Sequence, residues 1–313
     1  MNEQSTYDVA IIGGGPAGYT AGIYAARASL NAAVFEQGMP GGQIATSDTI
    51  DNYPAFPSIS GAELGMKMQE HSEQAGAQTI YEMVNNVHID ETGEFDVETD
   101  SATYHARSLI VATGARPRLA GFKGENDYRG RGISYCATCD GMFYRGKDLF
   151  VVGGGNSAVE EAMFLAKIAK HVTMVVRKNQ FRASRGMVSR LLEHDNVSVR
   201  FNTSINEVTG GTLLNRIEFI DTTNGESRVE ELPEGSFGIF VFTGNDPVVD
   251  LVKDYVDLGS DGGVITDDSM MTKTPGLFCV GDMRTKQLRQ VITAAADGAI
   301  AGTAAYRYLE QLD

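Results

Sequence analysis

Two copies of one glycine-rich turn limit the folds open to this chain of 313 residues. The first copy, GGGPAG at residues 13–18, follows a short apolar strand expected at residues 7–12 and precedes a helix expected at residues 19–28. In such a G-x-G-x-x-G turn, the first glycine permits the tight bend, the second lets the backbone approach a pyrophosphate, and the third allows the helix to pack on the strand. Backbone N–H groups at the helix start then face phosphate oxygens. The pattern predicts a dinucleotide-binding unit.

An acidic residue follows the next strand of this unit. That strand is expected at residues 32–35 and leads into Glu36, which is 18 residues after Gly18. A carboxylate at this position accepts hydrogen bonds from ribose hydroxyls. A glycine-rich loop without a ligand is the alternative, but strand, helix and acid all stand where a dinucleotide needs them. We therefore expect the first unit to hold a nucleotide with a plain ribose, either FAD or NAD.

The turn recurs about 140 residues later with side chains of the opposite charge after it. GGGNSA at residues 153–158 lies between a strand expected at residues 148–152 and a helix expected at residues 159–170. Three basic side chains follow the next expected strand, at residues 172–176: Arg177, Lys178 and Arg182. Cations attract a 2′-phosphate, which an acid would repel, whereas the alternative is a solvated basic turn. The second unit is therefore predicted to bind NADP, so that one chain carries two nucleotides.

Composition narrows the class of protein further. Lys and Arg number 26 against 41 Asp and Glu, which gives a formal net charge of −15. This charge argues against a nucleic-acid binder, which needs a basic surface, and weakly against docking on anionic membranes. Residues 9–26 form an uncharged run as long as a membrane span, but five glycines and Pro16 fit a strand, turn and helix instead. Residues 1–4 carry none of the basic groups of a signal peptide, so we expect a cytoplasmic protein.

Two cysteines stand one helical turn apart shortly before the second glycine-rich turn. Cys136 and Cys139 form a C-x-x-C pair that Asp140 follows. A zinc site would need a second pair of ligands, and only Cys279 and five histidines without ligand spacing remain, so we expect no metal. A structural disulfide is unusual in a cytosolic chain, and two core cysteines are the other alternative. The spacing favours a redox-active pair with Asp140 as proton shuttle, and Cys279 is expected in the core.

In their order and spacing, the two turns and the cysteine pair resemble the low-molecular-weight bacterial thioredoxin reductases over essentially the whole chain. The resemblance implies a flavin-contacting loop at residues 41–43, a strand at residues 111–115 that closes the flavin half, and a second flavin fingerprint in which Asp282 bonds the ribityl chain. Residues 289–291 resemble the segment under the isoalloxazine ring. The residues expected to hold FAD are Gly13, Gly15, Pro16, Ala17, Gly18, Glu36, Gly42, Gln43, Asn52, Gly114, Gly281, Asp282, Arg289, Gln290 and Val291.

The same resemblance assigns the second turn to NADPH. At the 2′-phosphate, the family usually has the motif His-Arg-Arg-x-x-x-Arg. This chain has Val176 in place of the histidine and Lys178 in place of one arginine. Lysine is a point charge without the planar fork of arginine, so NADPH stays favoured while its selectivity over NADH is left open. The residues expected to hold NADPH are Gly153, Gly155, Asn156, Ser157, Ala158, Arg177, Lys178 and Arg182.

Three residues around the cysteine pair are implied in docking a protein partner. Arg131 matches a docking arginine of the family, and Met142 and Phe143 stand where the family often has two aromatic residues. Methionine can still fill an apolar pocket. The resemblance implies thioredoxin or a thioredoxin-like protein disulfide as the partner, and a homodimeric assembly.

The flavin motifs lie at both ends of the chain, and the second nucleotide unit lies between them. We therefore expect an α/β fold with parallel sheets and two Rossmann-like dinucleotide-binding domains, the second inserted into the first. Residues 1–116 and 245–313 would form the FAD-binding domain, and residues 117–244 the NADPH-binding domain that carries the cysteine pair and further strands at residues 197–202 and 214–220. Pro, Gly and charged residues at the two crossings suit linkers. The family rotates its inserted domain between two states, and these linkers would be the hinges.

The resemblance implies a thioredoxin-disulfide reductase that passes two electrons from NADPH through FAD to the Cys136–Cys139 disulfide and on to thioredoxin. Cys139 would be the sulfur next to the flavin, Cys136 the nucleophile toward thioredoxin, and Asp140 the proton donor to the leaving thiolate. The alternatives are a flavin disulfide reductase fed by ferredoxin or flavodoxin, a flavin dithiol oxidase, and a flavin- or NADP-sensing module without turnover. The first would lack an intact nucleotide turn and basic group, and the last needs no dithiol.

Overall fold

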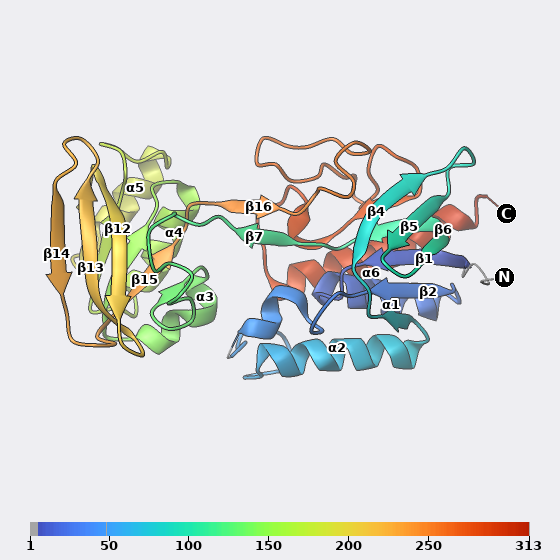
Figure 1. Cartoon of the computed structure of the whole chain (residues 1–313), viewed down its shortest axis with the longest axis horizontal. Coiled ribbons are helices and arrows are strands. Elements are labelled where there is room, and N and C mark those ends of the chain that lie inside the picture. Colours follow the sequence, from blue (N-terminus) through green and yellow to red (C-terminus); the bar gives the residue numbers. More distant parts are fainter. Residues whose placement is uncertain (1–5, 48, 313) are drawn as a thin grey trace. The chain divides into compact units, whose positions relative to one another are not determined.

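The computed structural model describes residues 6–47 and 49–312, which separate into two compact units (Figure 1). The terminal unit comprises the described residues up to Arg116 together with those from Asp246 onward, and the inserted unit comprises Pro117–Asn245. Each unit has its own sheets and its own hydrophobic core. Where the chain passes between the units, two short strands pair with each other: β7 (Ala115–Pro117) and β16 (Asn245–Pro247).

The terminal unit is built on a seven-stranded sheet in the order β3-β2-β1-β6-β5-β4, with β17 beside β6. Its strands are β1 (Thr6–Ile12), β2 (Ala32–Phe35), β3 (Gln78–Ile80), β4 (Val84–Ile89), β5 (Phe95–Thr99), β6 (Thr103–Val111) and β17 (Leu277–Cys279). β6 pairs with β1 along one edge, and along the other its first half lies antiparallel to β5 and its second half lies parallel to β17. β1, β2 and β6 run parallel, so their carboxyl ends meet at one edge of the sheet, where ligands of such folds bind.

Three helices cover one face of this sheet, namely α1 (Pro16–Arg27), α2 (Gly61–Ala75) and α6 (Val291–Leu309). α1 and α6 approach each other closely because a glycine lies at their contact. A Cβ atom on Gly298 would lie 2.1 Å from the carbonyl oxygen of Ala17. β4, β5 and the segment that follows β16 contribute to a second apolar layer on the other face. The first glycine-rich turn is therefore held between β1 and two packed helices.

The inserted unit has a five-stranded parallel sheet in the order β11-β10-β9-β15-β8. Helices α4 (Asn156–Ala166) and α5 (Arg185–Leu192) pack on one face of it, and a three-stranded antiparallel sheet covers the other. The parallel strands are β8 (Ile133–Ser134), β9 (Asp148–Val152), β10 (His171–Val175), β11 (Val197–Arg200) and β15 (Phe237–Val241). The antiparallel strands are β12 (Thr203–Gly210), β13 (Leu214–Asp221) and β14 (Ser227–Glu231).

The structure confirms the α/β class with two Rossmann-like units and corrects details of the sequence prediction. The sheets are not wholly parallel, because β4, β5 and β12 to β14 pair antiparallel. Both helices after the glycine-rich turns begin three residues earlier than expected, at Pro16 and Asn156. Proline suits the first helical turn, where its missing N–H is not needed. α4 also ends four residues early, at Ala166, whose carbonyl oxygen accepts a hydrogen bond from Asn196 Nδ2 at 2.8 Å.

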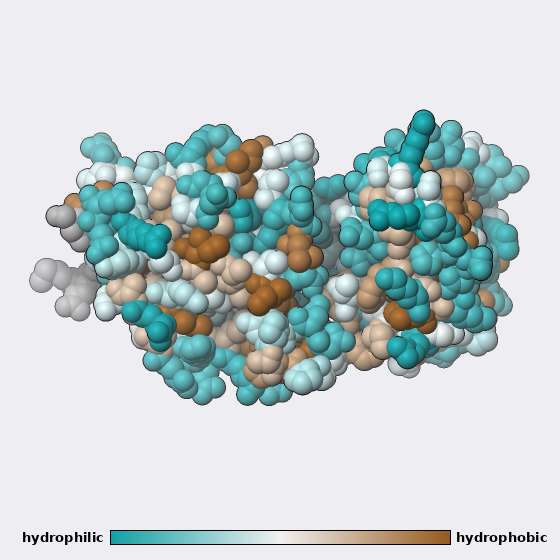
Figure 2. All heavy atoms as spheres, turned by 180° about the vertical axis from the view of Figure 1, so that it is seen from behind, coloured by the Kyte–Doolittle hydropathy of each residue, from teal (hydrophilic) through white to brown (hydrophobic). Residues whose placement is uncertain are grey.

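On the face shown in Figure 2, polar residues cover most of the surface and apolar residues form small separate patches. Among the helices of the described residues, none is both long and apolar enough to cross a membrane. The expectation that residues 1–4 lack a signal peptide lies outside the part of the chain that the structure describes.

Candidate functional site

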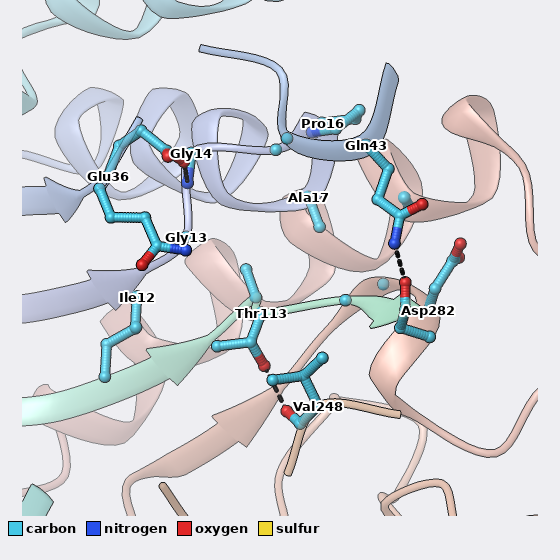
Figure 3. A pocket seen from close by; sticks show the side chains of 18 of the residues that line it. Ile12, Gly13, Gly14, Pro16, Ala17, Glu36, Gln43, Thr113, Val248 and Asp282 are labelled. Carbon is cyan, nitrogen blue, oxygen red and sulfur yellow. Dashed lines mark hydrogen bonds between the residues drawn. The ribbon is translucent and has the colours of Figure 1, made fainter. Parts of the chain in front are cut away.

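The terminal unit contains a cavity of about 640 Å³ at the carboxyl edge of its sheet. Its walls come from the turns after β1, β2 and β6, from the 3₁₀ helix η1 (Gly42–Thr46), and from the 3₁₀ helix η3 (Gly281–Met283) with the start of α6. Figure 3 shows Glu36 beside Gly14 at one end of this cavity, and Gln43 and Asp282 at the other. A volume of this size is in the range of cofactor pockets.

The first glycine-rich turn has the conformation that its spacing predicts. Gly13 has φ +107°, and a Cβ atom there would lie 2.5 Å from the Ala112 carbonyl oxygen. A Cβ atom on Gly18 would lie 1.8 Å from the Gly13 carbonyl oxygen, so the helix approaches the turn only because this side chain is absent. At Gly15, a Cβ atom would meet nothing closer than 3.9 Å. The turn thus leaves open backbone at the cavity, next to the N-terminus of α1.

Glu36 closes one end of the cavity. Its side chain is buried and its carboxylate accepts two backbone hydrogen bonds, from Gly14 N–H at 2.7 Å and from Gly38 N–H at 2.8 Å. These bonds hold the acid beside the glycine-rich turn, where a ribose would lie.

Asp282 lies at the other end, in η3. Its Oδ1 atom is buried without a hydrogen-bond partner among the described residues, and burial raises the pKa of its carboxyl. Lys286 and Arg289 act on this carboxyl in the opposite direction. A buried polar atom of this kind calls for a partner, which a ligand in the cavity would supply.

Twelve of the fifteen residues expected to hold FAD line this cavity, and three do not. Gly18 lies beneath the turn, and Asn52 is set back, donating from Nδ2 to Gln290 Oε1 at 3.0 Å. Arg289 lies behind the wall, where its Nη2 donates to Asp261 Oδ2 at 3.1 Å and its Nε donates to the Asp282 carbonyl oxygen at 3.3 Å. The residues that line the cavity are Gly13, Gly15, Pro16, Ala17, Glu36, Gly42, Gln43, Gly114, Gly281, Asp282, Gln290 and Val291.

Sequence reasoning missed other parts of the wall. Residues 82–85 line the cavity, and their position directly after the parallel strand β3 is a signal that could have found them. Val248 also lines it, and its carbonyl oxygen accepts from Thr113 Oγ1 at 2.6 Å (Figure 3). No local pattern marks Val248, which is 135 residues away from its partner in the chain.

The inserted unit contains a second cavity, of about 300 Å³, at its own glycine-rich turn. Gly153 has φ +148°, and a Cβ atom there would lie 2.5 Å from the Phe242 carbonyl oxygen. The backbone N–H of Arg182 donates to the Gly154 carbonyl oxygen at 2.7 Å, which fixes the basic segment against the turn. The predicted residues that line the cavity are Gly153, Arg177, Lys178 and Arg182.

The other predicted residues of the second turn lie outside the cavity wall: Gly155, Asn156, Ser157 and Ala158. Asn156 Oδ1 instead accepts from the Ser184 N–H at 3.0 Å, and so ties α4 to the segment before α5. Arg118, Gln180 and Thr203 line the cavity although sequence reasoning did not select them. Gln180 lies between predicted basic residues, whereas Thr203 has no local signal.

The two cysteines of the C-x-x-C pair form a disulfide, with Cα atoms 5.3 Å apart. Cys136 caps the short helix α3 (Ala137–Asp140), and the Cys139 N–H donates to Cys136 Sγ at 3.2 Å. Ser134, which sequence reasoning missed, lies beneath them. Its Oγ donates to Asp140 Oδ2 at 2.6 Å and accepts from the Cys136 N–H at 3.1 Å. This buried hydroxyl therefore couples the position of Asp140 to that of the disulfide.

The predicted docking residues belong to the same unit as the disulfide. Met142 and Phe143, in the 3₁₀ helix η2 (Gly141–Tyr144) that follows α3, are 46% and 52% exposed. Arg131 is also exposed, with its guanidinium 5.3 Å from the ring centre of Tyr128. All three side chains are therefore accessible to solvent.

Cys279 is fully buried in the core of the terminal unit, as predicted, and burial raises the pKa of its thiol. The described residues contain no group of three or more His, Cys, Asp or Glu side chains arranged to hold a metal ion.

Comparison with known proteins agrees with this geometry. The family model described as pyridine nucleotide-disulphide oxidoreductase matches residues 7–298. The chain is 42% identical to a thioredoxin reductase of Peptoclostridium litorale over 313 residues, 99% of each chain, and 41% identical to one of Bacillus subtilis over 100% of this chain and 98% of the relative. A crystal structure of thioredoxin reductase from Streptococcus pyogenes is 43% identical, covers 99% of this chain and 100% of its own, and has a TM-score of 0.87. The chain belongs to the pyridine nucleotide-disulphide oxidoreductases, a family of flavoproteins that use a nicotinamide nucleotide, and within it to the thioredoxin reductases.

Proposed function

We propose that this protein is an NADPH-dependent thioredoxin-disulfide reductase, in which FAD occupies the terminal unit and NADPH the inserted unit. The observation that carries the proposal is the Cys136–Cys139 disulfide, in one chain with two dinucleotide cavities whose charged walls differ in sign. The domain limits taken from the sequence, and the rotation of the inserted unit about its two crossings, belong to the same proposal.

Three features of the larger cavity support FAD there. Gly15 leaves room for a pyrophosphate at the start of α1, and Glu36 is placed to accept from ribose hydroxyls. Asp282 offers a buried oxygen that the described protein leaves unsatisfied, which suits the hydroxyls of a ribityl chain. When bound, the flavin relays two electrons between the nicotinamide and the disulfide.

The smaller cavity supports NADPH by its charge. Arg177, Lys178 and Arg182 supply three cations at its wall, and a 2′-phosphate is the group that distinguishes NADPH from NADH.

The dithiol chemistry balances with the residues present. Two electrons and two protons convert the Cys136–Cys139 disulfide to a dithiol. The Cys136 thiolate then attacks one sulfur of the substrate disulfide, forms a mixed disulfide and expels one substrate thiolate. The Cys139 thiolate attacks Cys136 Sγ, re-forms the internal disulfide and expels the second thiolate. Asp140, held by Ser134, is placed to give and take the protons.

The substrate is assigned to thioredoxin or a thioredoxin-like protein. Exposed Met142 and Phe143 follow the redox helix directly and offer apolar contact, and Arg131 offers a charge. The relatives that match over the full length carry the name thioredoxin reductase. A cytoplasmic homodimer completes the proposal.

Anaerobic stopped-flow absorbance tests the proposal. Purified yellow protein is mixed with NADPH or NADH, and then with oxidised thioredoxin. We expect fast flavin bleaching by NADPH, slower bleaching by NADH, and reoxidation by thioredoxin in the wild type but not in Cys136→Ser. Bleaching by neither nucleotide would favour the reductase fed by ferredoxin or flavodoxin. Reoxidation that is faster with oxygen than with thioredoxin would favour the dithiol oxidase.

A further inference from the structure

A buried ion cluster lies behind the wall of the larger cavity. Asp297, on α6, is 6% exposed, and its carboxylate accepts from three donors. Arg284 Nη1 donates to its Oδ1 at 3.0 Å, and Lys286 Nζ and the Gly281 N–H donate to its Oδ2 at 2.7 and 3.0 Å. The side chains of Arg284 and Lys286 are only 15% and 10% exposed. One buried carboxylate is therefore shared by two nearly buried cations.

The cluster touches the cavity wall at two places. Gly281, whose amide Asp297 holds, lines the cavity together with Asp282. Lys286 Nζ also donates to the carbonyl oxygen of Thr293 at 3.4 Å, and the next residue, Ala294, lines the cavity. Asp297 thus fastens the turn that carries Asp282 to the body of α6.

The cluster also carries an excess charge. Two cations and one carboxylate leave a formal charge of one positive unit in side chains that are largely removed from water. Charges shielded from water act over longer distances than exposed ones. Burial raises the pKa of the Asp282 carboxyl, Lys286 lowers it and Asp297 raises it, so the charges of the cluster are felt at the cavity wall.

We propose that Asp297, Arg284 and Lys286 are positioning residues for the flavin: Asp297 sets the Gly281–Asp282 turn, and the excess positive charge favours the reduced, anionic flavin over the oxidised one. This inference rests on the proposed binding of FAD in this cavity. The protein tunes a flavin through charges placed near its ring, and reduction at neutral pH adds negative charge to the ring system.

Two single substitutions change the cluster's charge in opposite directions. Lys286→Met removes a cation and leaves the Arg284–Asp297 pair intact. Asp297→Asn removes the anion but keeps an oxygen that can accept from the Gly281 amide. We expect Lys286→Met to lower the flavin midpoint potential and Asp297→Asn to raise it. Each variant should change the equilibrium constant for two-electron reduction of the flavin about tenfold, which shifts its midpoint potential by about 30 mV. The two shifts should have opposite signs.

Matched controls separate charge from packing. Lys286→Arg keeps the charge and should leave the potential near that of the wild type. Lys273→Met breaks an exposed pair with Asp257 in the same unit, so it should leave both the potential and FAD affinity unchanged. Thermal unfolding of the apoprotein reports any loss of stability, which Asp297→Asn should show because it leaves two cations unpaired.

The experiment is dye-equilibrated anaerobic titration of the flavin in a Cys136→Ser, Cys139→Ser background, where only the flavin accepts electrons. The FAD dissociation constant of each variant is measured alongside. Opposite shifts for the two charge variants support the inference. Shifts of the same sign, or a Lys286→Met potential equal to that of Lys273→Met, would overturn it, even if Asp297→Asn failed to fold. A wild-type protein that binds no flavin would instead overturn the proposed function.

Discussion

The glycine-rich turns at residues 13–18 of the terminal unit and 153–158 of the inserted unit have similar backbone geometry. They differ in the side chains that follow the next strand. In both, the first glycine has a positive φ and a Cβ atom would lie 2.5 Å from a carbonyl oxygen, that of Ala112 or that of Phe242. After the next strand, the first unit places buried Glu36 and the second places exposed Arg177 and Lys178. The two turns therefore share their backbone geometry, and the side chains after the next strand are what distinguish the two nucleotides that we propose for them.

The largest expected effect comes from blocking either turn. Gly13→Ala should lower FAD affinity, and Gly153→Ala should lower NADPH affinity while flavin stays bound, each by about a hundredfold, about 3 kcal/mol. Both put a methyl group against backbone that cannot yield. Titration of each ligand by fluorescence measures the loss.

Two open glycines serve as controls for backbone strain alone. Gly93 and Gly225 also have positive φ, but a Cβ atom there would meet nothing within 4 Å. Gly93→Ala and Gly225→Ala should bind both ligands like the wild type. Equal losses at all four positions would show that strain, and not the turn's approach to a ligand, causes the effect.

The basic side chains after the second turn, where the first turn has Glu36, predict the second-largest effect, which is on the choice between NADPH and NADH. Arg177→Ala together with Lys178→Ala should raise the KM for NADPH about thirtyfold and leave that for NADH within about twofold, because only NADPH has the 2′-phosphate. Steady-state kinetics with both nucleotides measure it. Lys167→Ala, an exposed cation of the same unit away from the cavity, is the control. An equal rise for the two nucleotides would contradict the assignment of these residues.

In the terminal unit, neutralising Glu36 should have a smaller effect on ligand binding than removing Arg177 and Lys178 has in the inserted unit. Glu36→Gln keeps an oxygen that can accept from Gly14 N–H but loses the charge that strengthens such bonds. FAD affinity should fall about tenfold, about 1.4 kcal/mol, as measured by equilibrium dialysis. An exposed acid of the same unit, Glu70, gives the control Glu70→Gln, which should be silent. Unchanged FAD binding in Glu36→Gln would remove the ribose role from this residue.

The smallest predicted effect is on stability, and it concerns a glutamate of the inserted unit that contrasts with Glu36. Glu161, on α4, has a buried Oε2 without a partner among the described residues, and burial raises its pKa to about 7. Its folded pKa lies above the ordinary 4.5, so the stability it contributes is present at low pH and is lost as the pH rises from about 4.5 to 7. Glu161→Gln should raise the free energy of unfolding by about 1 kcal/mol at pH 8 and by less at pH 5. This value allows for the partial exposure of the side chain, because solvent screens part of the effect.

Denaturant unfolding at the two pH values measures this difference. Glu226→Gln, at an exposed position of the same unit, removes a like charge from solvent and should show little change with pH, whereas Glu160 is no control because its charge also raises the pKa of Glu161. A stabilisation by Glu161→Gln that is the same at pH 5 and pH 8 would contradict the role of its ionisation.

Local sequence determined the parts of this protein whose geometry depends on neighbours in the chain. The two glycine-rich turns, the C-x-x-C disulfide and the acid or cations after the next strand all lie where the residue pattern predicts, because each rests on a bend, a helical turn or a strand end. The α/β class follows from the same units repeated along the chain.

Tertiary structure decided the rest, because it brings together residues far apart in the chain. Asn52 lies behind Gln290 of the larger cavity's wall, and Arg289 lies behind Asp282 of that wall, bonded to the Asp282 carbonyl oxygen and to Asp261. The cluster around Asp297 has no sequence signal at all, since an aspartate within an alanine-rich helix reveals its partners only once α6 has packed against the η3 turn. Local pattern encodes how a backbone bends, whereas the choice of partner for a buried charge depends on which segments folding places beside it.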